Sequence, residues 1–219
     1  MNHSSRPRVV IADDRALVVE AFSKMLGSVY NIVATAFDGR SLINATQRFR
    51  PDVVLTEIGM PLMNGLEAVY RIKRTLPEIK TICVTVHEDR EIVSEAFRRG
   101  VAGYVLKSSS RCELEKSIRQ VLRGQIYISP ALVPEFAYLL MPKPRRDAIE
   151  EPLTERQVDV MQLLAEGRSM KEAASVLNLT TRTIAFHKYR FMKNLCLKND
   201  AEVVRYAMQH YVVFTDNVQ

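Results

Sequence analysis

The chain has 219 residues, 47% of them hydrophobic, so it can form one large or two small domains and is not disordered throughout. The sequence has no run of about 18 apolar residues, the length needed to span a bilayer. Its three scattered cysteines lack metal-type spacing and fit a reduced compartment. We therefore expect a soluble cytoplasmic protein with no membrane partner. The net charge of +6 is spread, with 19 Lys and Arg against 14 Asp and Glu up to Gln125 and 9 against 7 from Leu153, so net charge alone does not indicate nucleic-acid binding.

Up to residue 123, strand-like and helical patterns alternate. We expect strands at 8–12, 31–36, 53–56, 81–85 and 103–106, and helices at 16–26, 40–49, 65–75, 91–99 and 111–122. Five such units predict an α/β fold, a five-stranded parallel doubly wound sheet with helices on both faces. No glycine-rich phosphate-binding loop follows the first strand, which argues against a dinucleotide or nucleoside triphosphate site.

Polar side chains follow four of these strands. Asp13 and Asp14 follow the first, Glu57 the third, Thr85 ends the fourth, and Lys107 follows the fifth. Each alone could be a solvated loop residue, but the carboxyl ends of parallel strands meet at one edge, where ligands bind. Clustered carboxylates repel one another unless a cation lies between them, and oxygen ligands suit Mg²⁺. The lysine and the threonine would donate to a phosphoryl group at the same edge.

These residues resemble the receiver domain of a two-component response regulator. The matching features are Asp13-Asp14, the acid at 57 followed by Met60-Pro61 and Asn64-Gly65, Thr85 and Lys107. The resemblance implies that Asp13, Asp14, Glu57 and the backbone carbonyl of Gly59 hold Mg²⁺, with Asp13 acting through water.

The same resemblance implies a partner and a signalling route. Lys107 would grip the phosphoryl group, Thr85 and Tyr104 would form the switch pair that reports it, and a sensor histidine kinase would be the partner. Glu57 departs from the family, whose phosphoacceptor is an aspartate. Its carboxylate lies one methylene farther out, and phosphoryl transfer depends on positioning, so we expect a poor acceptor. Glu57 is either a natural loss of phosphorylation or an introduced mimic of the phosphorylated state.

Composition divides the chain into a receiver domain at 6–125, a linker at 126–152 and a C-terminal domain at 153–219. The linker begins with an extended exit at 126–130 and continues with a short helix at 131–141, before a proline-rich polar stretch.

The C-terminal domain is expected to be all-α, with four helices. Thr154, Ser169 and Thr180 are the expected N-caps of the first three, which cover 155–166, 170–177 and the stretch from 180 to about 195, and a fourth covers 201–211. The short turn between the second and third helices predicts a helix-turn-helix.

The third of these helices has two different faces. At 100° per residue the expected core side consists of Ile184, His187, Phe191 and Leu195, and the outer side of Arg182, Phe186, Tyr189 and Lys193. The outer side is basic and aromatic, and no acid occurs from Thr180 to Asn194. A charged helix face is often merely solvated, but this one could enter a DNA groove, with Lys188 and Arg190 at its flanks for phosphates.

The C-terminal region resembles the LuxR-type helix-turn-helix of the NarL/FixJ class of response regulators. The matching residues are Leu153-Thr154, Leu163 to Gly167, Lys171 to Ala174, Leu177, Thr183-Ile184, His187, Met192-Lys193 and Ala201-Glu202. The resemblance implies double-stranded DNA as partner, a homodimer, and a structural role for His187. The candidate DNA-binding residues are Thr180, Thr181, Arg182, Ala185, Phe186, Lys188, Tyr189, Arg190 and Lys193.

Ala185, Phe186 and Tyr189 stand where the family often has basic or polar residues, which favours apolar contacts with thymine methyl groups. Three functions remain open: a transcription regulator controlled by its receiver, a constitutive regulator that needs no phosphorylation, and a Mg²⁺-dependent hydrolase or phosphatase. The third lacks a second acid/base constellation and leaves the helix-turn-helix unexplained. We therefore expect no catalytic residues and no enzyme.

Overall fold

The computed structural model describes residues 6–133, 153–210 and 212–214. The chain forms two compact units, Met1–Lys143 and Pro144–Gln219. Among the described residues, the helices are all too short or too polar to cross a bilayer.

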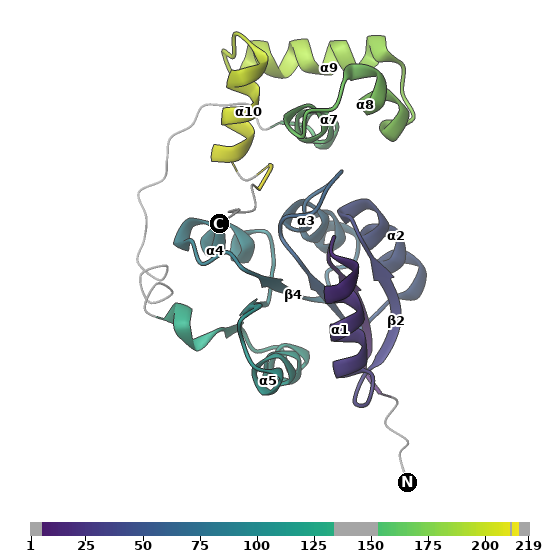
Figure 1. The fold of residues 1–219 in the computed structure, drawn as a ribbon, viewed down its shortest axis with the longest axis vertical. Helices are drawn as coiled ribbons and strands as arrows, with labels where there is room; N and C mark the ends of the chain where they lie inside the picture. Colours follow the sequence, from purple (N-terminus) through teal and green to yellow (C-terminus); the bar gives the residue numbers. More distant parts are fainter. Residues whose placement is uncertain (1–5, 134–152, 211, 215–219) are drawn as a thin grey trace. The chain divides into compact units, whose positions relative to one another are not determined.

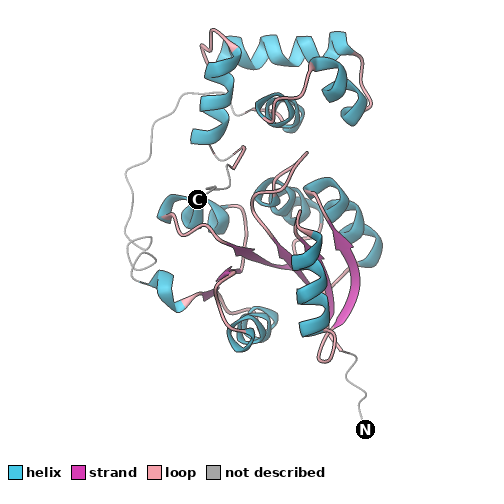
Figure 2. Cartoon of the chain, in the orientation of Figure 1, coloured by secondary structure: helices cyan, strands magenta, loops and turns pink. Residues whose placement is uncertain are grey.

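The first unit is built on one parallel sheet with helices on both of its faces (Figures 1 and 2). In spatial order its strands are β2 (Asn31–Ala36), β1 (Arg8–Ala12), β3 (Val53–Thr56), β4 (Lys80–Thr85), β5 (Gly103–Leu106) and β6 (Tyr127–Ile128). The expected architecture is confirmed, but the sheet has six strands rather than five. The extended exit pairs with β5 through Gly103–Tyr127 and Tyr104–Ile128. A two-residue strand is too short to give a periodic signal in the sequence.

Five helices in the described part of this unit flank the sheet. They are α1 (Ala16–Leu26), α2 (Gly39–Phe49), α3 (Gly65–Thr75), α4 (Arg90–Arg98) and α5 (Arg111–Leu122). Successive strand residues point to opposite faces, so Val9 joins a core with α1 and α5, whereas Val10 joins a core with α2 and α3. Each side chain buried in this way contributes about 1.5–3 kcal/mol. The sheet is therefore packed against helices on both of its faces.

The described residues of the second unit form four helices. They are α7 (Glu155–Ala165), α8 (Met170–Leu177), α9 (Thr181–Asn194) and α10 (Asp200–Gln209). The predicted N-caps are confirmed, because the hydroxyls of Thr154, Ser169 and Thr180 each accept the backbone N–H three residues later. Asn178 has a left-handed backbone (φ 52°) and makes the turn between α8 and α9.

Only the start of the linker helix expected at 131–141 can be compared with the structure. The structure has a single 3-10 turn, η1 (Pro130–Leu132), where that helix was expected to begin. Val133 is helical, and residues 134–141 of the expected helix lie outside the described residues.

Candidate functional site

At the carboxyl edge of the sheet, β1, β3 and β5 bring three charged side chains together. The Lys107 ammonium forms ion pairs with Asp13 and with Glu57, the latter at 2.6 Å from Nζ to Oε2. Asp13 and Glu57 are 2% and 4% exposed, and the Lys107 side chain is 11% exposed. One ammonium therefore bridges two buried carboxylates, and the Arg15 guanidinium also lies 3.7 Å from the Asp13 carboxylate.

The other oxygen of Glu57 is turned back onto its own loop. Oε1 accepts the N–H groups of Ile58 at 2.6 Å and Gly59 at 3.4 Å. The loop closes tightly, since Gly65 donates to the Ile58 carbonyl at 2.8 Å and a Cβ on Gly65 would lie 1.8 Å from the Glu57 carbonyl oxygen. Only glycine fits at 65, and Asn64 beside it caps α3. The Glu57 carboxylate is thus held from both sides.

The residues expected to hold Mg²⁺ meet only in part. Asp13 and Glu57 supply oxygen donors of the kind that Mg²⁺ prefers, but the Lys107 ammonium already lies between them. Asp14 is exposed and Gly59 is half-buried. Within the described ranges no three His, Cys, Asp or Glu side chains are arranged to hold a metal ion. The donor chemistry fits a divalent cation, and binding would require competition with Lys107.

The expected switch pair meets at the loop after β4. The Thr85 hydroxyl accepts the His87 N–H at 3.3 Å, and the Tyr104 hydroxyl donates to the His87 carbonyl at 2.9 Å. Burial, together with the nearby Cys83 and Glu57, raises the pKa of Tyr104 far above its ordinary value, so its hydroxyl stays a donor. Burial likewise raises the pKa of the Cys83 thiol. The sequence does not indicate that His87 links Thr85 and Tyr104, because the link is made by its backbone N–H and carbonyl and not by its imidazole.

On α9 the division into two faces is confirmed. Ile184 and Phe191 are fully buried, whereas Phe186 and Tyr189 are 55% and 67% exposed. The other residues on the exposed face are Thr181, Arg182, Ala185, Arg190 and Lys193, and the capping residue Thr180 is exposed as well. This face presents cations and aromatic rings without a carboxylate.

Lys188 and His187 lie away from that face. The Lys188 ammonium pairs with Asp200 at 2.6 Å, and its side chain is 21% exposed. Lys188 follows the buried Ile184 by one turn, which places it beside the core side. Burial, with Arg156 and Arg190 nearby, lowers the pKa of His187 below its ordinary value, so the imidazole is neutral at pH 7. These positions agree with a structural role for His187.

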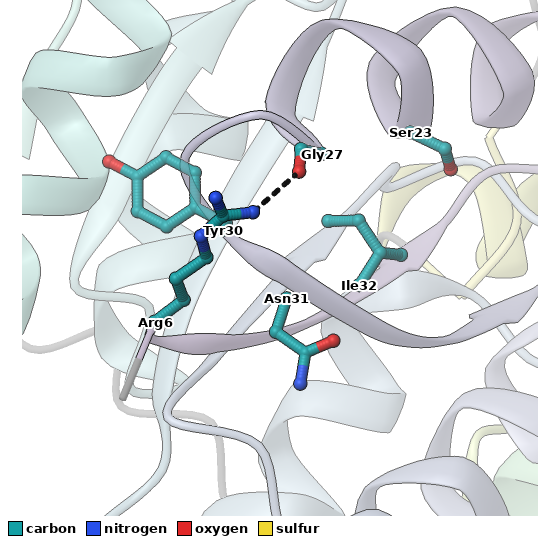
Figure 3. A pocket seen from close by; sticks show the side chains of 6 residues that line it. All are labelled: Arg6, Ser23, Gly27, Tyr30, Asn31 and Ile32. Atoms are coloured by element: carbon teal, nitrogen blue, oxygen red, sulfur yellow. Dashed lines mark hydrogen bonds between the residues drawn. The ribbon is translucent and has the colours of Figure 1, made fainter. Parts of the chain in front are cut away.

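A separate hollow of about 550 Å³ lies beside the ends of α1 and β2 (Figure 3). Its lining consists of Arg6, Ser23, Gly27, Tyr30, Asn31 and Ile32. Arg6 donates to the Gly27 carbonyl at 3.4 Å across its rim. Because β2 begins at Asn31, this hollow is at the amino edge of the sheet, opposite the edge with Glu57, and it shares no residue with the carboxylate cluster.

Two family models match the chain. Residues 9–119 match the response regulator receiver domain, and residues 151–207 match the bacterial regulatory proteins of the luxR family. The response regulator GacA of Pseudomonas aeruginosa is 30% identical over 208 residues, which cover 94% of this chain and 97% of GacA. The oxygen regulatory protein NreC of Staphylococcus carnosus is 31% identical, with 92% and 97% coverage.

Solved structures agree with these matches. The response regulator RcsB of Salmonella typhimurium is 25% identical, with a TM-score of 0.56 and coverage of 92% of this chain and 98% of that one. RcsB in a complex with DNA gives 26% identity and a TM-score of 0.57 over the same fractions of the two chains.

Proposed function

Since the chain belongs to the two-component response regulators that join a receiver domain to a LuxR-type DNA-binding domain, we propose that its receiver controls dimerisation and access of the C-terminal domain to DNA. As a transcription regulator it is not an enzyme. We assign the receiver to 6–125, the linker to 126–152 and the DNA-binding domain to 153–219. The matched regions and the two compact units support this division.

The exposed face of α9 carries the DNA-binding proposal. It has no acidic residue from Thr180 to Asn194, so it can approach a polyanion without repulsion. Arg190 and Lys193 are exposed and can reach phosphates, whereas Thr181, Arg182, Ala185, Phe186 and Tyr189 face the base edges. Thr180 at the helix N-terminus adds a further phosphate contact. RcsB is described as dimers bound to DNA, which supports a homodimer on two half-sites here.

A salt titration of binding to a random duplex tests this function. The slope of log K against log salt is negative, and we expect Lys193→Ala to reduce its magnitude by about 0.9, the value for one lost phosphate contact. Lys188→Ala is the matched control, because that ammonium is already paired with Asp200 and should change the slope less. Equal slopes for wild type and Lys193→Ala would contradict the assignment.

For the receiver we propose that Glu57 occupies the phosphoacceptor position without accepting a phosphoryl group. Its carboxylate is fixed by Lys107 and by the N–H groups of Ile58 and Gly59. The Glu57 carboxylate is therefore already paired with the Lys107 ammonium that would bind a phosphoryl group. Thr85 and Tyr104 form the switch pair through His87, and a sensor histidine kinase is the partner that the receiver domain implies.

Mg²⁺, when bound, would supply positive charge to a phosphoryl oxygen. Asp13, Asp14, Glu57 and the Gly59 carbonyl would hold it. Lys107 already neutralises part of this cluster, so we expect weak binding.

The second candidate function is a regulator that acts constitutively, without phosphorylation. The internal pairing of Glu57 with Lys107 favours it, because the receiver holds an anion at this position permanently. Incubation with acetyl phosphate followed by intact mass measurement tests the acceptor assignment. A gain of one phosphoryl group mapped to residue 57 of the wild-type protein would contradict it.

A further inference from the structure

Phe186 is held in place on the exposed face of α9. The Arg190 guanidinium lies over its ring, 5.7 Å from the centroid, one helical turn later. The His187 ring meets it edge-on, with centroids 5.6 Å apart and an interplanar angle of 72°. A cation–π contact of this exposed kind is worth about 0.5–1 kcal/mol. A single exposed apolar side chain is ordinary, but this ring has its orientation restricted by two neighbours.

The centre of this face has few hydrogen-bond donors. Ala185 and Phe186 have none in their side chains, and the Lys188 ammonium is turned to Asp200. The donors on this face come from Thr181, Arg182, Tyr189, Arg190 and Lys193, which surround the apolar surface of Ala185 and Phe186. Ala185 and Phe186 themselves cannot make the bidentate hydrogen bonds that distinguish guanine or adenine.

The major groove has one apolar feature at the base edges, the C5-methyl group of thymine. A cytosine methylated at C5 carries the same methyl group at the same ring position. An aromatic ring with a fixed orientation gains from burying that methyl and loses nothing in hydrogen bonding. Basic residues around it neutralise the phosphates on either side.

We propose that Phe186 is a specificity-determining residue that recognises the 5-methyl group of a pyrimidine in the major groove, and that Arg190 is a positioning residue that orients its ring. This inference rests on the proposed DNA-binding function and adds the chemical class of the base that is read. Thymine and 5-methylcytosine satisfy it equally, whereas uracil and cytosine do not.

The test uses the full chain and a duplex selected from a random pool by binding. Thymines are replaced one at a time by uracil, which removes only the methyl group. Burial of one methyl is worth about 0.8 kcal/mol, so at one position in each half-site we expect about fourfold weaker binding of wild type. Replacing that uracil by 5-methylcytosine, with guanine opposite, should recover affinity relative to unmethylated cytosine.

Variants separate the roles of the residues. Phe186→Ala should bind the thymine and uracil duplexes equally, whereas Tyr189→Phe, the matched aromatic control, should keep the fourfold ratio. Arg190→Met should lower affinity for both duplexes and also reduce the ratio, and Arg190→Lys should restore part of it.

The outcomes distinguish the inference from the function on which it depends. If wild type binds every uracil-substituted duplex as tightly as its parent, or Phe186→Ala keeps the wild-type ratio, methyl recognition by Phe186 is overturned while DNA binding stands. If no duplex is bound, or no substitution on α9 changes binding to any duplex, the proposed function itself fails.

Discussion

The carboxylate cluster of the first unit and the exposed face of α9 use similar charged side chains in opposite ways. In the cluster, the Lys107 ammonium is paired with the buried carboxylates of Asp13 and Glu57 inside the fold. On α9, Arg182 and Lys193 are exposed and no carboxylate lies among them. A buried ion pair broken on one side leaves an uncompensated charge, whereas an exposed cation is hydrated and can be removed at little cost. Substitutions in the cluster should therefore change stability, and substitutions on α9 should change binding.

The largest expected effect comes from Lys107→Met. It leaves Asp13 and Glu57 buried without their shared ammonium, and removing one partner of a buried pair costs about 3–5 kcal/mol. Urea unfolding of the receiver, followed by circular dichroism, measures this loss. Lys24→Met is the matched control, because its partner Glu20 and the lysine itself are exposed, and the pair is worth less than about 1 kcal/mol. Equal losses for the two variants would remove the distinction between the buried cluster and an exposed pair.

Mg²⁺ binding gives a second test of the same carboxylate cluster. We expect weak Mg²⁺ binding by wild type and no detectable binding by Asp14→Ala, since one carboxylate supplies both a ligand and much of the local field. Isothermal titration calorimetry of both proteins measures this. The same Mg²⁺ affinity in the two would show that Asp14 takes no part in the site.

Helix capping sharpens the comparison within the second unit. Thr180→Ala and Ser169→Ala each remove a cap hydroxyl that accepts a backbone N–H, from Thr183 at 3.1 Å and from Glu172 at 3.2 Å. Each substitution should lower the stability of this unit by about 1 kcal/mol. Only Thr180 belongs to the proposed DNA face, so only its variant should also weaken DNA binding. A loss of DNA affinity of the same size from Ser169→Ala would mean that capping alone accounts for the effect.

The smallest expected effect is a pH dependence from His187. Burial, Arg156 and Arg190 hold its pKa below the ordinary 6.5, so the unfolded chain binds a proton more readily than the folded one. The contribution of neutral His187 to the free energy of unfolding is complete above pH 6.5, the ordinary pKa, and is lost as pH falls through the lower pKa of the folded state. Unfolding of the C-terminal unit between pH 7.5 and 5 should show a steeper decline for wild type than for His187→Gln. Parallel curves would exclude this contribution.

Much of the fold follows from the sequence, because its elements have strong local patterns. Buried apolar runs predict five strands, and the hydroxyls of Thr154, Ser169 and Thr180 predict three helix starts that the structure confirms. The sixth strand was missed because only Tyr127 and Ile128 form it, and its pairing with β5 is a long-range contact.

The site was predictable in its location but not in its contacts. Strand ends indicate the edge where Asp13, Glu57 and Lys107 meet, but not that the lysine bridges both acids. The pairing of Lys188 with Asp200 depends on where the chain after α9 places the start of α10. Helical periodicity gives a usable signal there, since Lys188 lies one turn from the buried Ile184.

The most direct test of the account is the DNA affinity of wild type and Glu57→Asp, each with and without acetyl phosphate, with intact mass measured on the same samples. We expect wild type to gain no mass and to keep one DNA affinity in both conditions, because the Glu57 carboxylate is held by Lys107 and by its own loop. Glu57→Asp should gain one phosphoryl group and change its affinity when it does so. A phosphoryl group on Glu57 of wild type, accompanied by a change in DNA affinity, would contradict the account.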